Sequence, residues 1–343
     1  MALRDEILEQ KNSIKTLLDN QADTIRSIAQ SIGKPSGIFI AARGTSDNAA
    51  RYAKYVWGYN NRIPVALAAP SLFSVYQKPP LLGDNLVVGI SQSGESPDIL
   101  AVLAEANHQG CSTLAITNLP DSPLGLEANY VIDIQAGPEL SVAATKSYTA
   151  QLGAIAMLSA AWTGEPELWK QLAEIPDFIA ALLEQENQIQ TYALRYRYMD
   201  QCVVLGRGFN YATAFEWSLK LKELTYVVAQ PYSSADFLHG PIALVSSGFP
   251  VFAVAAQGEV LEDMAALLKK LKEIHRADLF IISENQDLLQ IADCPLSLPA
   301  GIPEWLSPLV CIIPAQLFSY HLTLIKGIDP DTPRGLTKVT LTN

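Results

Sequence analysis

Val88-Gly-Ile-Ser-Gln-Ser-Gly-Glu-Ser-Pro-Asp-Ile-Leu100 predicts a buried strand, a tight turn and the start of a helix. Pro97 suits the first turn of a helix, and Asp98 suits its positive end. Gly94 would let the backbone approach a ligand closely. The turn carries four polar side chains, those of Ser91, Gln92, Ser93 and Ser96. Such a turn can hold a phosphate on the free N–H groups of the helix start, or it can be an ordinary polar turn with a good N-cap. The pattern alone favours neither.

The composition is that of a globular, acidic protein. Apolar residues make up 49% of the 343 residues and charged residues 17%, which suits two domains or one large one. The net charge of −11 argues against nucleic acid or an anionic membrane surface as a partner. The four cysteines lack metal-ligand spacing and are expected to be buried thiols. We expect no secretory leader and no membrane span, and therefore a cytoplasmic protein.

Strands alternate with helices along the chain, which predicts an α/β fold with a doubly wound parallel sheet. An amphipathic helical segment over 3–32 comes first. The strands expected in the first half are 37–42, 65–67, 86–90, 112–117 and 130–134. The helices expected around them are 47–57, 71–76, 99–109 and 142–162, followed by a helical bridge to about 197.

The second half of the chain repeats the first. The matching pairs, all at one offset of 164 residues, are Arg43/Arg207, Gly44/Gly208, Gly94/Gly258, Glu95/Glu259, Ala136/Ala300 and Gly137/Gly301. We interpret this as a duplicated α/β domain, with the functional cleft expected where the copies meet. Only the first copy has hydroxyl side chains at both turns, so it is expected to be the phosphate-binding half.

The repeat also sets the expected boundaries. They are a helical segment over 1–34, a first domain over 35–165, a helical bridge over 166–197, a second domain over 198–328, and a tail over 329–343 that could cover the active site.

Three further groups could carry chemistry. Glu223 follows Lys220 by three residues, so both share a helix face. The pair is either a solvated salt bridge, which the spacing favours, or a carboxylate base tuned by a lysine. His239 precedes Gly-Pro and is either a structural histidine or an imidazole presented by a fixed loop. Lys338 is either a solvated lysine of the tail or an amine that forms an imine with a carbonyl group.

Together these residues resemble the isomerase half of the glucosamine-6-phosphate synthases, which is built from two SIS (sugar isomerase) domains. The similar segments run in the same order over nearly the whole chain and are 6–10, 43–46, 91–95, 142–146, 219–223, 239–241, 320–327 and 333–338.

The resemblance implies a role for each candidate residue. It places the sugar phosphate and neighbouring hydroxyls on Thr45, Ser46, Ser91, Gln92, Ser93 and Ser96, with backbone contacts from Val142 and Thr337. Glu223, beside Lys220, would move a proton between C1 and C2 of the sugar. Lys338 would form an imine with the open-chain ketose. His239 would assist ring opening in the active site of the neighbouring subunit of a homodimer. The resemblance implies no metal and no organic cofactor.

The chain also departs from the synthases. Arg43 stands where they usually have a small residue, and Ser96, Asp236, Leu238 and Gly335 replace other residues. Residue 2 is Ala, and the first cysteine is Cys111, so we expect no glutaminase activity.

These observations predict an enzyme that isomerises and deaminates an amino-sugar phosphate, converting glucosamine 6-phosphate to fructose 6-phosphate and ammonia. Two alternatives stay open. One is a deglycase of a fructosamine-type phosphate, or another phosphosugar isomerase. The other, from a different class, is a non-catalytic regulator that binds a sugar phosphate. Such a regulator would need the hydroxyl turns, but not Glu223, His239 and Lys338 together.

Overall fold

In the computed structural model, which describes residues 2–338, the chain forms two compact units with one five-stranded parallel sheet each. The first-sheet unit contains residues 9–140 and 144–176 and the described tail from Thr337. The second-sheet unit contains residues 2–8, 141–143 and 177–336. The strand order is β2-β1-β3-β4-β5 in one sheet and β7-β6-β8-β9-β10 in the other. The shared order confirms the predicted α/β fold of two tandem domains.

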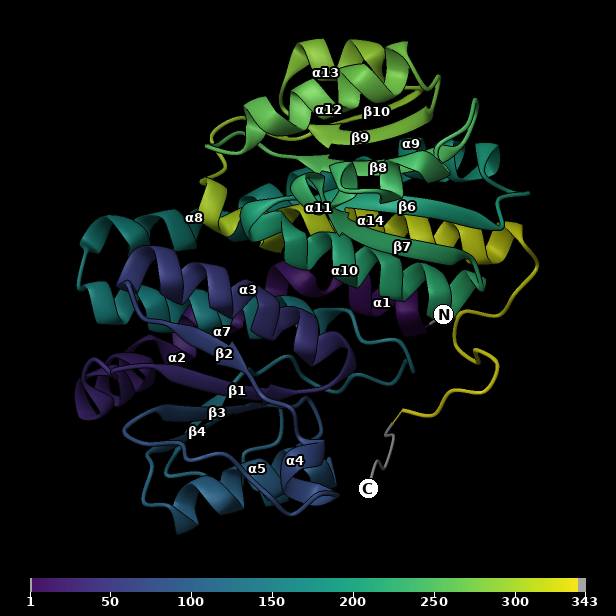
Figure 1. Ribbon diagram of the computed structural model, residues 1–343. Helices are drawn as coiled ribbons and strands as arrows, with labels where there is room; N and C mark the ends of the chain where they lie inside the picture. Colours follow the sequence, from purple (N-terminus) through teal and green to yellow (C-terminus); the bar gives the residue numbers. More distant parts are fainter. Residues whose placement is uncertain (1, 339–343) are drawn as a thin grey trace. The chain divides into compact units, whose positions relative to one another are not determined.

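The first sheet is buried by helices on both faces. Its strands are β1 (Ile38–Ala42), β2 (Val65–Leu67), β3 (Leu86–Ile90), β4 (Thr113–Thr117) and β5 (Tyr130–Asp133). The helices of this unit are α2 (Gln10–Ile32), α3 (Gly44–Asn61), α4 (Ser71–Ser74), α5 (Pro97–His108), α6 (Pro123–Glu127) and α7 (Lys146–Thr163). Figure 1 shows α3 and α7 on one face of the sheet and α5 on the other. Because both faces are covered, β3 is a continuous apolar run with no alternation.

The second sheet is covered in the same way. Its strands are β6 (Gln201–Gly206), β7 (Val228–Ser233), β8 (Pro250–Ala255), β9 (Asp278–Ser283) and β10 (Cys294–Ser297). The longer helices are α1 (Ala2–Leu8), α9 (Glu186–Arg195), α10 (Tyr211–Lys220), α11 (Ser234–Leu238), α12 (Leu261–Glu273), α13 (Gln286–Ile291) and α14 (Ser307–Ile325). The short turns are η1 (Gly208–Asn210), η2 (Leu221–Thr225), η3 (Pro241–Leu244) and η4 (Glu304–Leu306). The boundary between the units falls within α8 (Pro166–Leu183).

An aromatic cluster fills the core on one face of the second sheet. Trp217 of α10, Phe252 of β8, Phe280 of β9 and Phe318 of α14 have ring centroids between 5.0 and 6.0 Å apart. Aromatic pairs at this separation add to the energy of burial. The helix α10 is thereby fixed on the sheet, and it leads directly into the turn that carries Glu223.

The strand order fixes where a ligand would bind. In the first sheet β1 pairs with β2 on one side and with β3 on the other, so the connections leave β1 and β3 toward opposite sides. A crevice opens at the carboxyl ends of the strands at such a switch point. The segments that follow β1 and β3 are 43–46 and 91–96. In the second sheet the equivalent place follows β6 and β8.

One local expectation was wrong, and one glycine has a role in packing. The helix expected to begin at Val142 begins at Lys146, because the Glu139 carboxylate accepts the N–H groups of Thr145 and Ser147 and so caps the helix there. Gly94 does have a positive φ of 65°, but a Cβ at this position would lie 1.9 Å from Oγ of Ser122. The glycine therefore makes room for Ser122.

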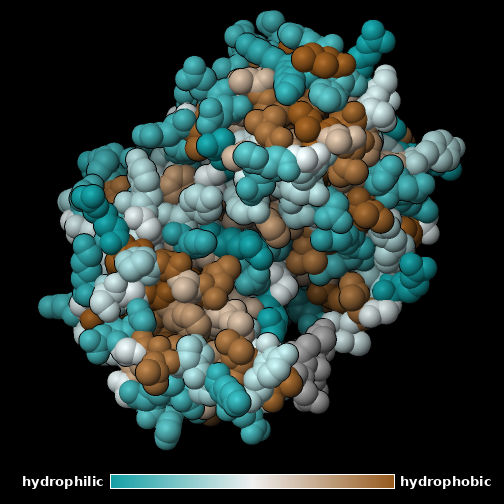
Figure 2. Space-filling view, viewed as in Figure 1, coloured by the Kyte–Doolittle hydropathy of each residue, from teal (hydrophilic) through white to brown (hydrophobic). Residues whose placement is uncertain are grey.

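One helix is more apolar than the sequence analysis allowed. Residues 304–325 are long and apolar enough to cross a membrane, but 89% of their most apolar stretch is buried inside the protein, as in a core helix. On the surface shown in Figure 2, apolar side chains gather around β2 and α4 of the first-sheet unit. Exposed large apolar side chains after α4 in the sequence are those of Val75, Tyr76 and Leu81, of which Leu81 is 95% exposed.

Candidate active site

The hydroxyl groups of the first-sheet unit gather at the switch point. Thr45 and Ser46 lie in the first turn of α3, directly after β1, and the polar turn 91–96 follows the neighbouring strand β3. Ser46 Oγ accepts a hydrogen bond of 3.0 Å from Nε2 of Gln151 in α7, which fixes its position. The predicted phosphate-binding side chains thus lie on two adjacent turns at one edge of the sheet.

Some polar side chains of the turn after β3 are bonded within the turn, and others are not bonded. Ser91 Oγ accepts the Gly94 N–H at 3.1 Å, and Ser93 Oγ accepts the Glu95 N–H at 3.3 Å. The side chains of Gln92 and Ser96, by contrast, have no hydrogen-bond partner in the described part of the chain. The helix α5 starts directly after Ser96, so its first N–H groups and its dipole face the turn. This arrangement suits an anion.

Lys338 is held by the protein and is not a solvated lysine. Its Nζ lies 2.9 Å from Oε2 of Glu139, in the same unit, and the Glu139 side chain has no exposed surface. Oε1 of Glu139 accepts the N–H groups of Thr145 and Ser147 at 2.9 and 3.1 Å. Oε2 also accepts the hydroxyl of Ser147 at 2.7 Å.

These contacts decide the charge of Glu139. Burial acts to raise the pKa of this carboxyl, but the charge of Lys338 and the hydrogen bonds from Thr145 and Ser147 outweigh it. The pKa of Glu139 therefore lies below its ordinary value, and the group is an anion at neutral pH. The sequence analysis did not single out Glu139. An acidic residue shortly before an expected helix start was the available signal.

Lys220 and Glu223 form the core of a second group, in the second-sheet unit. Lys220 Nζ lies 2.6 Å from Oε2 of Glu223 and 3.4 Å from Oε1 of Glu216. Lys220 and Glu216 are completely buried, whereas the Glu223 side chain is 22% exposed. Burial acts to lower the pKa of Lys220, but Glu216 and Glu223 outweigh it and raise the pKa above its ordinary value. The predicted pair is thus not solvated. Glu216, which the sequence analysis missed, precedes Lys220 by four residues on the same helix face.

Glu223 lies in an unusual backbone. It belongs to η2, a π-helical turn that continues α10 and ends at Tyr226, whose φ is 59°. Turns of this kind are rare and occur frequently at functional sites. The hydroxyl of Tyr226 accepts the N–H of Arg334 at 2.7 Å, and the Arg334 guanidinium lies 4.5 Å from the centroid of the Tyr226 ring. The start of the tail is therefore fixed to the element that carries Glu223.

The remaining candidates are His239, Val142 and Thr337. His239 follows α11, is exposed, and its imidazole has no hydrogen-bond partner in residues 2–338. It is therefore not held as a structural histidine in this chain. Val142 is half-buried in the second-sheet unit, and Thr337 is exposed beside Lys338 in the first-sheet unit.

The second copy fills its own switch point with carboxylates. Oε2 of Glu304 accepts the N–H of Glu259 at 2.9 Å, and a Cβ on Gly258 would lie 2.1 Å from the carboxyl carbon of Glu304. Oε2 of Glu284 accepts the N–H of Gln257, also at 2.9 Å. The N–H groups of Gln257 and Glu259, which follow β8, are therefore already bonded to carboxyl groups of the protein itself.

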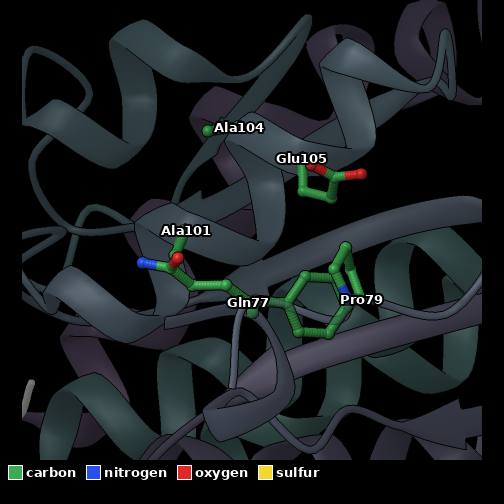
Figure 3. A pocket seen from close by; sticks show the side chains of 6 residues that line it. Gln77, Pro79, Ala101, Ala104 and Glu105 are labelled. Atoms are coloured by element: carbon green, nitrogen blue, oxygen red, sulfur yellow. The ribbon is translucent and has the colours of Figure 1, made fainter. Parts of the chain in front are cut away.

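A pocket of about 310 Å³ lies between α5 and the segment formed by α4 and the loop after it (Figure 3). Ala101, Ala104 and Glu105 of α5 line it together with Gln77 and Pro79 of the loop after α4. None of the candidate residues lines this pocket. Within residues 2–338 no group of three or more His, Cys, Asp or Glu side chains is placed to hold a metal ion.

Known proteins share this sequence and fold. The SIS domain profile matches residues 31–161 and 195–326. The isomerizing glutamine–fructose-6-phosphate aminotransferase of Methanothermobacter thermautotrophicus is 36% identical over 97% of this chain. The corresponding protein of Thermococcus kodakarensis is 33% identical over 97% of this chain. The chain spans 56% of the length of each of these two relatives.

Two solved structures are similar over nearly their whole length. The C-terminal domain of the glucosamine-fructose-6-phosphate aminotransferase of Francisella tularensis has a TM-score of 0.88 and 29% identity, and the match covers 97% of this chain and 98% of that one. A protein of Silicibacter pomeroyi DSS-3, proposed to be a phosphosugar isomerase, has a TM-score of 0.86 and 32% identity, with 96% and 100% covered.

Proposed function

The chain belongs to the SIS (sugar isomerase) domain family, as its motifs predicted, and on this premise we propose that it is an aldose–ketose isomerase of an amino-sugar phosphate. The proposed reaction is that of glucosamine 6-phosphate with water, which gives fructose 6-phosphate and ammonia. It uses no metal and no organic cofactor. The relatives named above act on, or are proposed to act on, phosphosugars, which supports this substrate class.

One set of residues binds the substrate, and a second set carries out the reaction. The phosphate and the neighbouring hydroxyl groups of the sugar are bound by the polar side chains of the two turns, those of Thr45, Ser46, Ser91, Gln92, Ser93 and Ser96. The backbones of Val142 and Thr337 contact the sugar. The phosphate is remote from the reacting carbons, so its binding energy serves to hold the open chain in position. His239 assists ring opening, and the described part of the tail, residues 329–338, covers the substrate; the same expectation for 339–343 lies outside the described residues.

Glu223 is the proposed base. It takes the proton from one of the two carbons C1 and C2 and returns it to the other, while Lys220 holds the carboxylate in place. Lys338 forms an imine with the ketose carbonyl, and Glu139 holds its amine beforehand. A carboxylate positioned in this way contributes typically 10²- to 10⁴-fold to the rate of a proton transfer.

The arrangement around Glu223 is the observation that carries the proposal. A solvated salt bridge needs neither a buried lysine nor a second, completely buried glutamate. Here both are present, and the one carboxylate of the three groups that keeps an exposed surface is Glu223. Arg334 of the tail, which also carries Lys338, contacts Tyr226, three residues after Glu223. Both features favour an enzyme over a regulator that only binds sugar phosphates.

We also propose a cytoplasmic homodimer in which His239 serves the neighbouring subunit. Two observations support this. His239 is exposed and unbonded within its own chain. The four cysteines are all buried free thiols, which suits a reducing compartment.

The test is to incubate the purified chain with glucosamine 6-phosphate and to measure fructose 6-phosphate and ammonia. We expect equal amounts of the two products. Glu223→Gln should form neither product, while calorimetry shows sugar-phosphate binding within a few-fold of wild type. Full turnover by Glu223→Gln would refute the assignment. Release of free amine from a fructosamine 6-phosphate, without ammonia from glucosamine 6-phosphate, would instead favour the deglycase. Binding without turnover of any phosphosugar in a panel would favour the regulator.

A further inference from the structure

We propose that Arg43 binds the phosphate of the substrate directly, in addition to the hydroxyl groups of the two turns. The inference rests on the proposed function, since it concerns the same site. Arg43 would add a positive charge for the phosphate, which the hydroxyl groups of the two turns do not provide. Arg43 is the residue between β1 and α3, in extended backbone conformation, directly before Gly44.

Arg43 bridges the two turns at the switch point. Its Nε donates a hydrogen bond of 2.6 Å to Oδ2 of Asp98, which lies in the first turn of α5. Arg43 follows β1 and Asp98 follows the turn after β3, so the side chain crosses from one hydroxyl turn to the other. The guanidinium therefore lies beside the start of α5, where the helix dipole also favours an anion.

The contact with Asp98 uses one nitrogen and leaves the others available. Asp98 is 1% exposed, so its carboxylate is a fixed anchor, whereas the Arg43 side chain is 49% exposed. Nη1 and Nη2 of Arg43 make no hydrogen bond to any residue between 2 and 338. A guanidinium held at Nε presents its two terminal nitrogens as a planar fork, which matches two oxygens of a phosphate.

The second copy provides the contrast. Arg207 holds the same place after β6, but both of its terminal nitrogens have protein partners. Nη1 lies 3.4 Å from Oγ of Ser234, and Nη2 lies 3.1 Å from Oδ2 of Asp263. The neighbouring turn is filled by the carboxylate of Glu304. The second copy thus gives both terminal nitrogens of its arginine a partner, whereas those of Arg43 have none within residues 2–338.

A local cation matters because the chain as a whole repels phosphate. The net charge is −11, so no basic field concentrates a dianion near the site. Asp98 adds a further negative charge at the start of α5. Arg43 neutralises it and still offers two donors, which is what a phosphate-binding turn in an acidic protein requires.

The test is calorimetric titration of fructose 6-phosphate into wild type and variants at two salt concentrations. Arg43→Ala should raise the Kd about 10- to 100-fold, since it removes charge-assisted hydrogen bonds. It should also make the Kd less dependent on salt. Arg43→Lys keeps the positive charge but not the two terminal nitrogens of the guanidinium. Its Kd should lie between those of wild type and Arg43→Ala. Arg207→Ala is the matched control at the repeated position, and its Kd should stay within twofold of wild type. A thermal melt of each variant confirms that it is folded.

Two outcomes would overturn the inference alone. One is that the wild type binds fructose 6-phosphate and the Kd of Arg43→Ala is within twofold of the wild-type Kd, or no higher than the Kd of Arg207→Ala. The other is recovery of wild-type affinity in the double variant Arg43→Ala/Asp98→Asn, because Arg43 would then only neutralise Asp98. Affinity that stays low in the double variant supports direct contact. If the wild type binds neither fructose 6-phosphate nor glucosamine 6-phosphate, the proposed function falls, and this inference falls with it.

Discussion

Lys220 Nζ lies between Oε2 of Glu223, at 2.6 Å, and Oε1 of Glu216, at 3.4 Å, and the lysine has no exposed surface. Removing Lys220 and Glu216 from water costs several kcal/mol per ion, which the mutual attraction only partly offsets. A fold that needed only stability at this place would be served as well by apolar residues. The buried arrangement is therefore better explained by the need to fix the carboxylate of Glu223.

Lys220→Met tests this burial directly. It leaves the carboxylate of Glu216 buried without its partner, so we expect the free energy of unfolding to fall by about 3–5 kcal/mol in urea denaturation. Lys170→Met is the control, because Lys170 forms the same i, i+3 pair with Glu167 while both side chains are more than half exposed. That control should lose no more than about 1 kcal/mol. Equal losses in the two variants would contradict the buried triad, and adding Glu216→Gln to Lys220→Met should recover part of the loss.

The Glu139–Lys338 pair makes the stability depend on pH. The pKa of Glu139 lies below its ordinary value of 4.5, so the folded state favours the ionised form. This contribution is complete above about pH 4.5 and is lost as the pH falls through the lower folded-state pKa. Glu139→Gln should therefore be less stable than wild type by about 1–3 kcal/mol at pH 7, and the difference should shrink toward pH 3. A difference that grows as the pH falls would show that Glu139 is not bound as an anion.

Gly94→Ala should lower the stability of the protein, because the added Cβ would clash with Ser122. Gly94→Ala places a Cβ 1.9 Å from Oγ of Ser122 and at a positive φ, whereas Gly110→Ala meets only the positive φ with no atom within 4 Å. We expect about 1–2 kcal/mol of destabilisation for Gly110→Ala and a further 1–3 kcal/mol for Gly94→Ala. Thermal or urea unfolding measures both. Equal destabilisation would mean that Ser122 moves away freely.

Lys338 should be the lysine that becomes attached to the sugar. Its amine attacks the ketose carbonyl, water leaves, and borohydride reduces the resulting C=N bond to a stable secondary amine. Peptide mapping of protein reduced in the presence of fructose 6-phosphate should find the adduct on Lys338. Lys338→Arg should remove it while phosphate binding is kept. An adduct of equal yield in Lys338→Arg, or one confined to another lysine, would exclude the imine at this residue.

Much of the fold was predictable, because the signals for it are local. Apolar runs bounded by glycine and hydroxyl turns predicted the five strands of the first sheet, and the shared offset predicted the second sheet with the same order. The late start of α7 was not predictable from helical periodicity. It depends on the side chain of Glu139, which reaches back to the N–H groups of Thr145 and Ser147.

The sequence predicted which residues belong to the candidate site, but not how deeply they are buried or which distant residues they contact. The spacing of Lys220 and Glu223 predicted their contact, yet it favoured a solvated pair, because burial depends on how α10 packs on a distant sheet. Glu216 could have been found, since it lies four residues before Lys220. Glu304 could not, because its carboxylate reaches a turn 45 residues earlier in the chain. The contrast between Arg43 and Arg207 likewise appears only once their partners are known.

Proton exchange at the sugar tests the central claim most directly. Fructose 6-phosphate is incubated with the protein and ammonium in D2O, and loss of the C1 proton is followed by NMR. The wild type should exchange this proton, and Glu223→Gln should slow the exchange by at least about 10²-fold while it still binds the sugar phosphate. Exchange at the wild-type rate in Glu223→Gln, or no exchange by the wild type with any sugar phosphate that it binds, would contradict an isomerase that uses Glu223 as its base.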